Sequence, residues 1–347
     1  MPDPTLQQAT DDAIERAADN LSRGRVVAFP TETVYGLGAD ATNDEAVARI
    51  YQIKERPVYN PLIVHLATPE AAIELAESPD IAQSLMAAFW PGALTLVLNK
   101  SKTAPLAKAV TADQNSVALR CPSHPVARRL LKAFGGPIAA PSANLSGRTS
   151  PTSAAHVAES FAGRPVGKQP DMILAGGASK IGLESTIVDL TNPVYPIVLR
   201  QGGIPQEAIE GVIGRALSDP REKVDQSPPK APGGLKRHYA TTTPLRLDAV
   251  DVKSGEALLG FGSLSFVASE DYDAAKKMPD QLLRNLSAHG DLGEAAANLF
   301  HSMRELDKVG AKRIAVMKIP EVGLGRAIND RLRRAAVRAD QRENDDE

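Results

Sequence analysis

Apolar positions in the first two thirds of the chain follow two different periods, which predicts a mixture of helices and strands. Ile14, Ala17 and Leu21 recur at helical spacing and Gly24 is suited to end their helix, which we place at 11–21. Short apolar runs bounded by turn residues predict strands. The predicted strands cover 26–29, 62–66, 94–98, 117–121, 138–140, 172–174, 186–190 and 197–200, and further helices cover 69–77, 80–89, 124–134, 153–162 and 205–217.

The stretch after the strand at 26–29 contains a glycine motif that needs its own interpretation. We predict a loop over 31–41 and then a helix, since Thr42 and Glu45 have the spacing of a capping box. Gly36-Leu-Gly-Ala-Asp-Ala matches one form of the dinucleotide-binding fingerprint, but that motif needs its first glycine directly after a strand and its last at a helix start. Residues 31–35 intervene here, so the pattern argues against NAD binding.

A change of pattern divides the chain into two domains. Residues 218–244 hold five prolines and no hydrophobic period, which indicates a linker. Strands at 245–250, 257–261 and 314–319 follow, with a helix carrying Leu292, Leu299 and Met303 and another from 323 to 338. We therefore expect an α/β catalytic domain over 10–217, a linker over 218–244, a smaller α/β domain over 245–338 and a frayed polar tail over 339–347.

Charge is uneven along this chain, although its net value is only −2 over 347 residues. Between 101 and 150 seven basic residues face a single acidic one, Asp113. Such a stretch is typical of a surface that binds phosphate, nucleotide or RNA, and equally of a solvated helix face. The basic residues are Lys102, Lys108, Arg120, Arg128, Arg129, Lys132 and Arg148.

Several other classes of protein are disfavoured by the composition. Cys121 is the only cysteine, so no intrachain disulfide forms and an oxidising compartment is not indicated. The six histidines lack metal-ligand spacing, which argues against a zinc site. No apolar run is long enough to span a bilayer and no signal-peptide pattern is present, so we expect a cytoplasmic protein without a membrane partner.

Candidate chemistry gathers at the ends of the predicted elements. Lys54 and Arg56 end a helix, where they could hold polyphosphate oxygens or simply favour the helix C-terminus. Arg120 ends an apolar strand with a guanidinium that suits a bidentate carboxylate contact, and Arg200 ends another apolar strand. Residues 141–147 place hydroxyls and an amide after the strand at 138–140, where open α/β sheets bind ligands, although such a segment can equally be a polar turn. Polar groups at so many strand ends predict one shared pocket.

Taken in order, these segments resemble the Sua5/YrdC family of threonylcarbamoyl-AMP synthases over about residues 10–338. The motifs are Phe29-Pro-Thr-Glu-Thr-Val-Tyr-Gly-Leu-Gly, Lys54-Glu-Arg-Pro with Asn60-Pro-Leu-Ile-Val-His, Ser116-Val-Ala-Leu-Arg, Ala140-Pro-Ser-Ala-Asn-Leu-Ser-Gly and Ser185-Thr-Ile-Val-Asp-Leu. The long form of the family adds segments like Ala231-Pro-Gly-Gly-Leu-Lys-Arg-His-Tyr, Asn298-Leu-Phe with Arg304-Glu-Leu-Asp, and Gly323-Leu-Gly-Arg-Ala-Ile-Asn-Asp-Arg-Leu.

The resemblance implies a fold and a reaction. The fold is a YrdC-like twisted mixed-sheet α/β domain with an open ligand groove, a long linker and a smaller Rossmann-like α/β domain. The reaction is nucleotidyl transfer: L-threonine, bicarbonate or CO2, and ATP give threonylcarbamoyl-AMP and pyrophosphate. This is the first step of N6-threonylcarbamoyladenosine formation at the tRNA adenosine next to the anticodon, and a threonylcarbamoyl-transferase complex acts downstream.

The resemblance also assigns roles to residues. Lys54 and Arg56 would be catalytic, neutralising charge on the phosphates, with Mg2+ held mainly by the ATP phosphates and not by a protein ligand. The residues expected around L-threonine are Thr33, His65, Arg120, Ser142 and Ser185, with Arg120 on the carboxylate. The residues expected around ATP are Lys54, Arg56, Asn60, Ser116, Ala140, Asn144, Ser150, Arg200 and Tyr239.

Tyr239 lies in the predicted linker. By resemblance the linker folds over the pocket and Tyr239 reaches the nucleotide, whereas a lone aromatic in a linker can also pack wherever it fits. Gly234 and Thr241 depart from the family's usual linker residues, which predicts a looser lid.

Two other functions compete with this interpretation. They are a non-catalytic RNA-binding module, or a related carbamoyl-transfer enzyme whose usual zinc-finger and acylphosphatase-like segments are absent. A weak direct contact with tRNA is compatible with the main interpretation.

Overall fold

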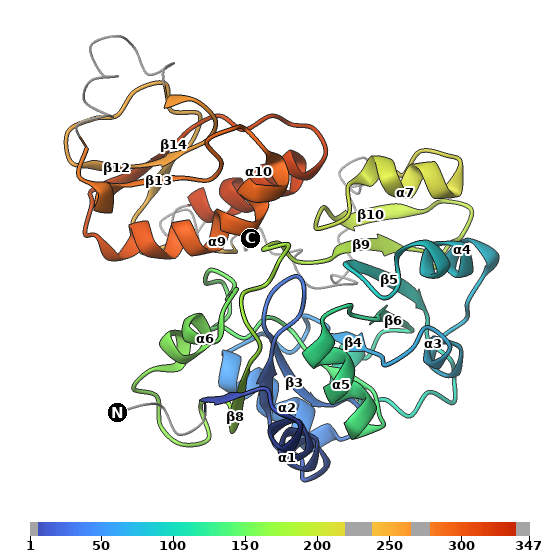
Figure 1. Ribbon diagram of the computed structural model, residues 1–347. Coiled ribbons are helices and arrows are strands. Elements are labelled where there is room, and N and C mark those ends of the chain that lie inside the picture. The colour runs from blue at the N-terminus through green and yellow to red at the C-terminus, as the bar shows by residue number, and fades with distance from the viewer. Residues whose placement is uncertain (1–5, 219–237, 265–277, 338–347) are drawn as a thin grey trace, which may run out of the picture. The chain divides into compact units, whose positions relative to one another are not determined.

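The computed structural model describes residues 6–218, 238–264 and 278–337 (Figure 1). These residues fall into two compact units. The first contains 6–146 and 150–218, and the second contains 147–149 together with the described residues from 238 onward. The predicted linker lies mostly outside the described residues, as does the predicted tail, so the domain limits expected from the sequence stay predictions.

One large mixed sheet forms the centre of the first unit. In the described part of the chain its strand order is β1-β8-β2-β3-β7-β4-β6-β5-β9-β10. The strands are β1 (Leu6–Gln8), β2 (Val27–Phe29), β3 (Gly36–Asp40), β4 (Ile63–His65), β5 (Leu94–Asn99), β6 (Ser116–Arg120), β7 (Ile138–Ala139), β8 (Met172–Ala175), β9 (Thr186–Asp189) and β10 (Ile197–Arg200). The mixed α/β fold predicted for this unit is confirmed.

Helices cover this sheet on both faces because its strands are apolar on both sides. In β2, Val27 and Phe29 join the core with α1 and α5, whereas Ala28 faces the core with α2. The helices are α1 (Asp11–Ser22), α2 (Asp44–Lys54), α3 (Ala71–Leu75), α4 (Asp80–Phe89), α5 (Pro125–Phe134), α6 (Ala154–Phe161) and α7 (Gln206–Ile213), with a 3-10 turn η1 (Lys108–Thr111). The expected twisted mixed sheet is therefore a buried central layer.

Two expectations for the glycine-rich stretch are wrong. Residues 36–40 form strand β3 between β2 and β7, not a loop. A Cβ on Gly38 would lie 2.7 Å from the Phe29 ring, so this glycine serves strand packing and not a pyrophosphate. The cap of α2 is Asn43, whose side chain accepts the Ala46 N–H, while Thr42 bonds to Asp40 instead. Asn43 lies one residue closer to the helix than Thr42, and its side-chain oxygen satisfies a free N–H of the first turn directly.

A smaller parallel sheet organises the second unit. Its order in the described residues is β11-β14-β12-β13, formed by β11 (Leu245–Arg246), β12 (Glu256–Gly260), β13 (Leu283–Asn285) and β14 (Arg313–Val316). All three strand pairs are parallel. Helices α9 (Leu292–Lys308) and α10 (Leu324–Ala336) pack on it, and η4 (Asp280–Leu282) precedes β13. The predicted strand at 245–250 is shorter than expected, and β13 was not predicted.

Candidate active site

Lys54 connects the end of helix α2 to the loop that follows β7 through hydrogen bonds. Its Nζ donates to the carbonyl oxygens of Ser142, at 2.5 Å, and Asn144, at 2.6 Å. Its own carbonyl accepts the N–H of Ser146 at 2.8 Å. The side chain is buried. Because an ammonium has three N–H donors, these two bonds leave one donor for a ligand.

Arg56 lies just beyond the same helix end. Glu55 caps the helix in the left-handed conformation, with a φ of 53°, and so turns the chain sharply before Arg56. The guanidinium donates to the carbonyls of Asn60, at 3.0 Å, and Pro61, at 2.8 Å. Asn60 is 1% exposed, and among the described residues its Oδ1 has no hydrogen-bond partner. A buried amide oxygen without a partner is costly, which is typical of a ligand site.

The cations of this region repel one another. Burial, followed by repulsion from Arg56, holds the pKa of Lys54 well below its usual value. Burial also lowers the pKa of Arg56 to about 10, and Arg200 adds to that decrease. Buried like charges raise the free energy of the folded protein unless an anion compensates them. The three cations therefore favour binding of a polyanion.

Arg200 belongs to a chain of polar contacts at one end of β9. Its guanidinium donates to the carbonyl and to the hydroxyl of Ser185, both at 3.1 Å. The Ser185 hydroxyl lies 2.7 Å from the hydroxyl of Thr95. Glu184, the residue before Ser185, accepts a hydrogen bond of 2.6 Å from Ser150. Two predicted site residues, Ser150 and Arg200, therefore contact residues 184–185.

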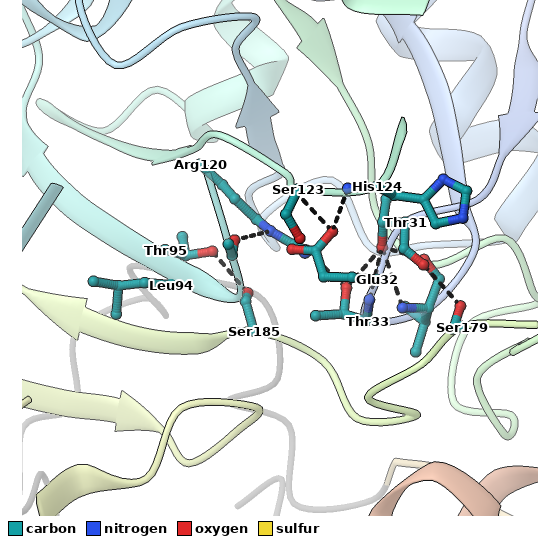
Figure 2. A network of polar contacts seen from close by, with 12 residues as sticks. Thr31, Glu32, Thr33, Leu94, Thr95, Arg120, Ser123, His124, Ser179 and Ser185 are labelled. Carbon is teal, nitrogen blue, oxygen red and sulfur yellow. Dashed lines mark hydrogen bonds and ion pairs between the residues drawn. The ribbon is translucent and has the colours of Figure 1, made fainter. Parts of the chain in front are cut away.

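Arg120 is the centre of the polar network in Figure 2. It is buried and forms an ion pair of 2.6 Å with Glu32. It also donates to the Thr33 hydroxyl at 2.9 Å and to the Gly92 carbonyl at 3.2 Å. The structure therefore brings together two residues predicted around L-threonine and adds a carboxylate that the sequence interpretation did not assign.

His65 sits beside Arg120 because the two residues are in register on the parallel strands β4 and β6. Burial and the neighbouring positive charge of Arg120 lower the pKa of His65 to about 3. The imidazole is therefore neutral near pH 7, so it can form hydrogen bonds to a substrate but is a poor base there. The edge of its ring meets Phe29 with centroids 6.1 Å apart.

Ser116, Ala140 and Tyr239 are the remaining predicted site residues. Ser116 begins β6 and Arg120 ends it, so about 13 Å of strand separates them. Ala140 donates its N–H to the carbonyl of Ile63 at 2.9 Å. Tyr239 belongs to the second unit, where its ring stacks on Phe300 with centroids 5.4 Å apart. Its predicted contact with the nucleotide stays a prediction.

Sequence reasoning missed the acidic partners of the site. Glu32 lies inside a quoted motif and Glu184 directly before one, but neither received a role, although each lies beside a largely apolar strand. A carboxylate beside a strand that is otherwise apolar is itself a signal, since it needs a buried partner. Identifying that partner required the tertiary structure: Glu32 and Arg120 are 88 residues apart.

The described residues contain no cluster of metal ligands, and two residues of the basic stretch are paired with acids. Within them, no group of three or more His, Cys, Asp and Glu side chains could hold a metal ion. Two residues of the basic stretch of 101–150 are already paired with acids: Arg120 is buried against Glu32, and Arg129 forms an ion pair with Asp11.

Family models match both parts of the chain. The model named Sua5_yciO_yrdC, described as "Telomere recombination", matches residues 19–202. The model described as "Threonylcarbamoyl-AMP synthase, C-terminal domain" matches residues 204–337. The two matches follow one another along the chain, in agreement with the long form expected from the motifs.

Full-length relatives agree with the family models. A threonylcarbamoyl-AMP synthase of Pyrococcus abyssi is 42% identical over 93% of this chain and 94% of its own length. One of Bacillus subtilis is 41% identical over 96% of both chains. The crystal structure of the P. abyssi protein complexed with L-threonine covers 96% of both chains with a TM-score of 0.80 and 38% identity. The chain belongs to the Sua5/YrdC family of threonylcarbamoyl-AMP synthases, in its two-domain form.

Proposed function

We propose that this chain makes threonylcarbamoyl-AMP and pyrophosphate from L-threonine, bicarbonate or CO2, and ATP, with the residues described above as its machinery. The observation that carries the proposal is the set of three buried cations, Lys54, Arg56 and Arg200. Burial, with repulsion from a neighbouring cation, lowers the pKa of Lys54 and of Arg56, and such a set suits a triphosphate. The family has this activity, and the product supplies the threonylcarbamoyl group of modified tRNA adenosine.

The chemistry requires positioning and charge neutralisation and no covalent intermediate on the protein. The threonine amine adds to CO2 and gives a carbamate with loss of a proton. A carbamate oxygen then forms a bond to the α-phosphorus as the bond to pyrophosphate breaks. Buried cations that are already fixed by carbonyls stabilise the charge that develops in this step without reorganising. Mg2+ enters with ATP as part of the substrate, coordinated by its phosphates.

Each substrate has its own group of residues in this proposal. Arg120 takes the threonine carboxylate, and the side chains around the rest of the amino acid are those of Thr33, His65, Ser142 and Ser185. The P. abyssi protein was crystallised as a complex with L-threonine, which supports a threonine site in this fold. The nucleotide meets Lys54, Arg56, Asn60, Ser116, Ala140, Asn144, Ser150, Arg200 and Tyr239.

The cellular setting is proposed from the same function. Threonylcarbamoyl-AMP is a labile mixed anhydride, so a transferase complex that uses it on tRNA must act next. We propose a cytoplasmic location with at most weak contact to tRNA. No helix in the described residues is long and apolar enough to cross a membrane.

The test measures pyrophosphate release with each substrate omitted in turn. We expect release to require ATP, bicarbonate and L-threonine together. Arg56→Met should raise the KM for ATP by about 10-fold or more, since it removes a fixed cation from the phosphates. Arg164→Met is the matched control, because Arg164 pairs with the neighbouring Glu55 at 2.6 Å and has no part in the site.

The outcome separates this enzyme from the competing classes. Release that does not depend on threonine would contradict the proposal. RNA binding with a steep salt dependence and no ATP turnover would instead identify a binding module. Turnover of carbamoyl phosphate in place of bicarbonate would identify a carbamoyl-transfer enzyme.

A further inference from the structure

Glu32 connects three separate elements around Arg120. It follows β2, is 6% exposed, and its Oε1 accepts a hydrogen bond of 2.6 Å from Arg120 at the end of β6. Its Oε2 accepts the backbone N–H groups of Ser123, at 3.1 Å, and His124, at 3.3 Å, at the start of α5. Figure 2 shows this carboxylate between the guanidinium and the start of the helix.

Only a carboxylate fits this position. Both oxygens accept hydrogen bonds, whereas an amide would turn an NH2 group toward either Arg120 or the two backbone N–H donors. The positive end of α5 favours a negative charge there. Burial raises the pKa of Glu32, but the charge of Arg120 and the hydrogen bonds outweigh it and lower the pKa below its usual value. Glu32 is therefore ionised at neutral pH.

The network also determines which way Arg120 can face. Thr31 lies 2.6 Å from the Val34 carbonyl and so donates its hydroxyl hydrogen there, which leaves Thr33 to donate to Thr31. Thr33 can then only accept from Arg120. Of the five N–H donors of the guanidinium, three are used by Glu32, Thr33 and Gly92. The other two are held in one orientation for a ligand.

We propose that Glu32 is the positioning residue of the amino-acid site: it holds the Arg120 guanidinium so that its two remaining N–H donors meet the carboxylate of L-threonine. The inference rests on the proposed function and deepens it. Glu32 touches Arg120 and not the substrate, so its contribution lies in threonine affinity. The nucleotide site, built on Lys54, Arg56 and Arg200, is independent of it.

The test compares Glu32→Gln and Glu32→Asp with the wild type. We expect Glu32→Gln to raise the KM for L-threonine by about 10-fold to 100-fold, because a charge-assisted hydrogen bond and the orientation of Arg120 are lost. The KM for ATP should stay within about 2-fold, since the phosphate cations are unchanged. Glu32→Asp keeps the charge and should therefore recover part of the threonine affinity.

Glu256→Gln provides the matched control. Glu256 is 5% exposed and accepts two hydrogen bonds from Arg246, at 3.0 and 2.5 Å, so it too is a buried carboxylate paired with an arginine, but in the second unit. It should leave the threonine KM unchanged even where it lowers stability. If Glu32→Gln does not fold, the calorimetric Kd of Glu32→Asp for L-threonine decides, with a several-fold weakening expected.

Either of two results would overturn the inference. One is a wild-type threonine KM in Glu32→Gln, or a wild-type threonine Kd in Glu32→Asp. The other is an equal rise in the KM values for threonine and ATP, which is what a general loss of structure produces. A wild-type enzyme without threonine-dependent turnover would refute the proposed function itself, which keeps the two failures distinct.

Discussion

Replacing Lys54 by methionine tests whether this buried cation serves catalysis or the stability of the fold. The substitution removes two hydrogen bonds from a charged donor, to the carbonyls of Ser142 and Asn144, although the Ser142 carbonyl keeps the Asn144 N–H at 3.0 Å. A hydrogen bond to a charged group contributes about 1.5–3 kcal/mol, so the loss is about 3–6 kcal/mol. The change also removes a buried charge that Arg56 repels, which recovers several kcal/mol of desolvation. The two effects nearly cancel.

We therefore expect Lys54→Met to change the free energy of unfolding by no more than about 2 kcal/mol in denaturant titration. Its kcat/KM for ATP should fall by about 100-fold or more in the pyrophosphate assay, because a fixed cation no longer stabilises the transferring phosphate. Lys132→Met, which changes an exposed lysine on α5, should leave both quantities unchanged.

Two results would refute this reasoning. A loss of stability above about 4 kcal/mol would mean that Lys54 mainly holds the loop carbonyls in place. A kcat/KM for ATP close to the wild-type value would mean that its third donor does not reach the phosphates. In either case Arg56 and Arg200 would remain as the phosphate-binding cations.

Packing and titration of single residues give three further predictions. Gly38→Ala should lower the free energy of unfolding by about 1–3 kcal/mol, since its Cβ would overlap the Phe29 ring; an unchanged denaturation midpoint would contradict this. The folded pKa of His65 is about 3, so the stability it contributes above pH 6.5 is lost as the pH falls toward 3, at about 1.4 kcal/mol per pH unit. His65→Asn should flatten that dependence in unfolding curves at pH 4.5 and 7, and an equally steep curve would disprove the assignment. Tyr239→Ala should destabilise the second unit by about 3 kcal/mol through lost stacking on Phe300, and should raise unproductive ATP hydrolysis. Tyr239→Phe keeps the ring and should have a smaller effect on both quantities; equal effects of the two variants would show that the ring contributes nothing.

Most of the elements could be predicted from the sequence, because their signals are local. The helix at 80–89 and the strand at 197–200 agree with α4 and β10 at both ends. Helical spacing and short apolar runs follow directly from which side chains must be buried. The family motifs likewise lie in continuous segments, and the matching family models bear out the resemblance drawn from them.

Strand β3 shows where local signals fail. Its sequence, Gly36 to Asp40, contains residues with low strand propensity, and only its pairing with β2 and β7 makes it a strand. The short strands β11 and β13 also depend on their neighbours in the parallel sheet. Propensity is a weak guide wherever the partners that satisfy the backbone come from distant parts of the chain.

For the site, the sequence by itself identified residue types, and the tertiary structure decided their partners. Lys54, Arg56, Arg120 and Arg200 were recognisable as candidate ligands for anions from their positions at element ends. That Arg120 is already paired with Glu32, or that Lys54 already holds two carbonyls, follows only from the fold. The pKa of a buried charge, and the donors that it has left for a ligand, depend on the neighbouring residues. Those neighbours come from segments far apart in sequence.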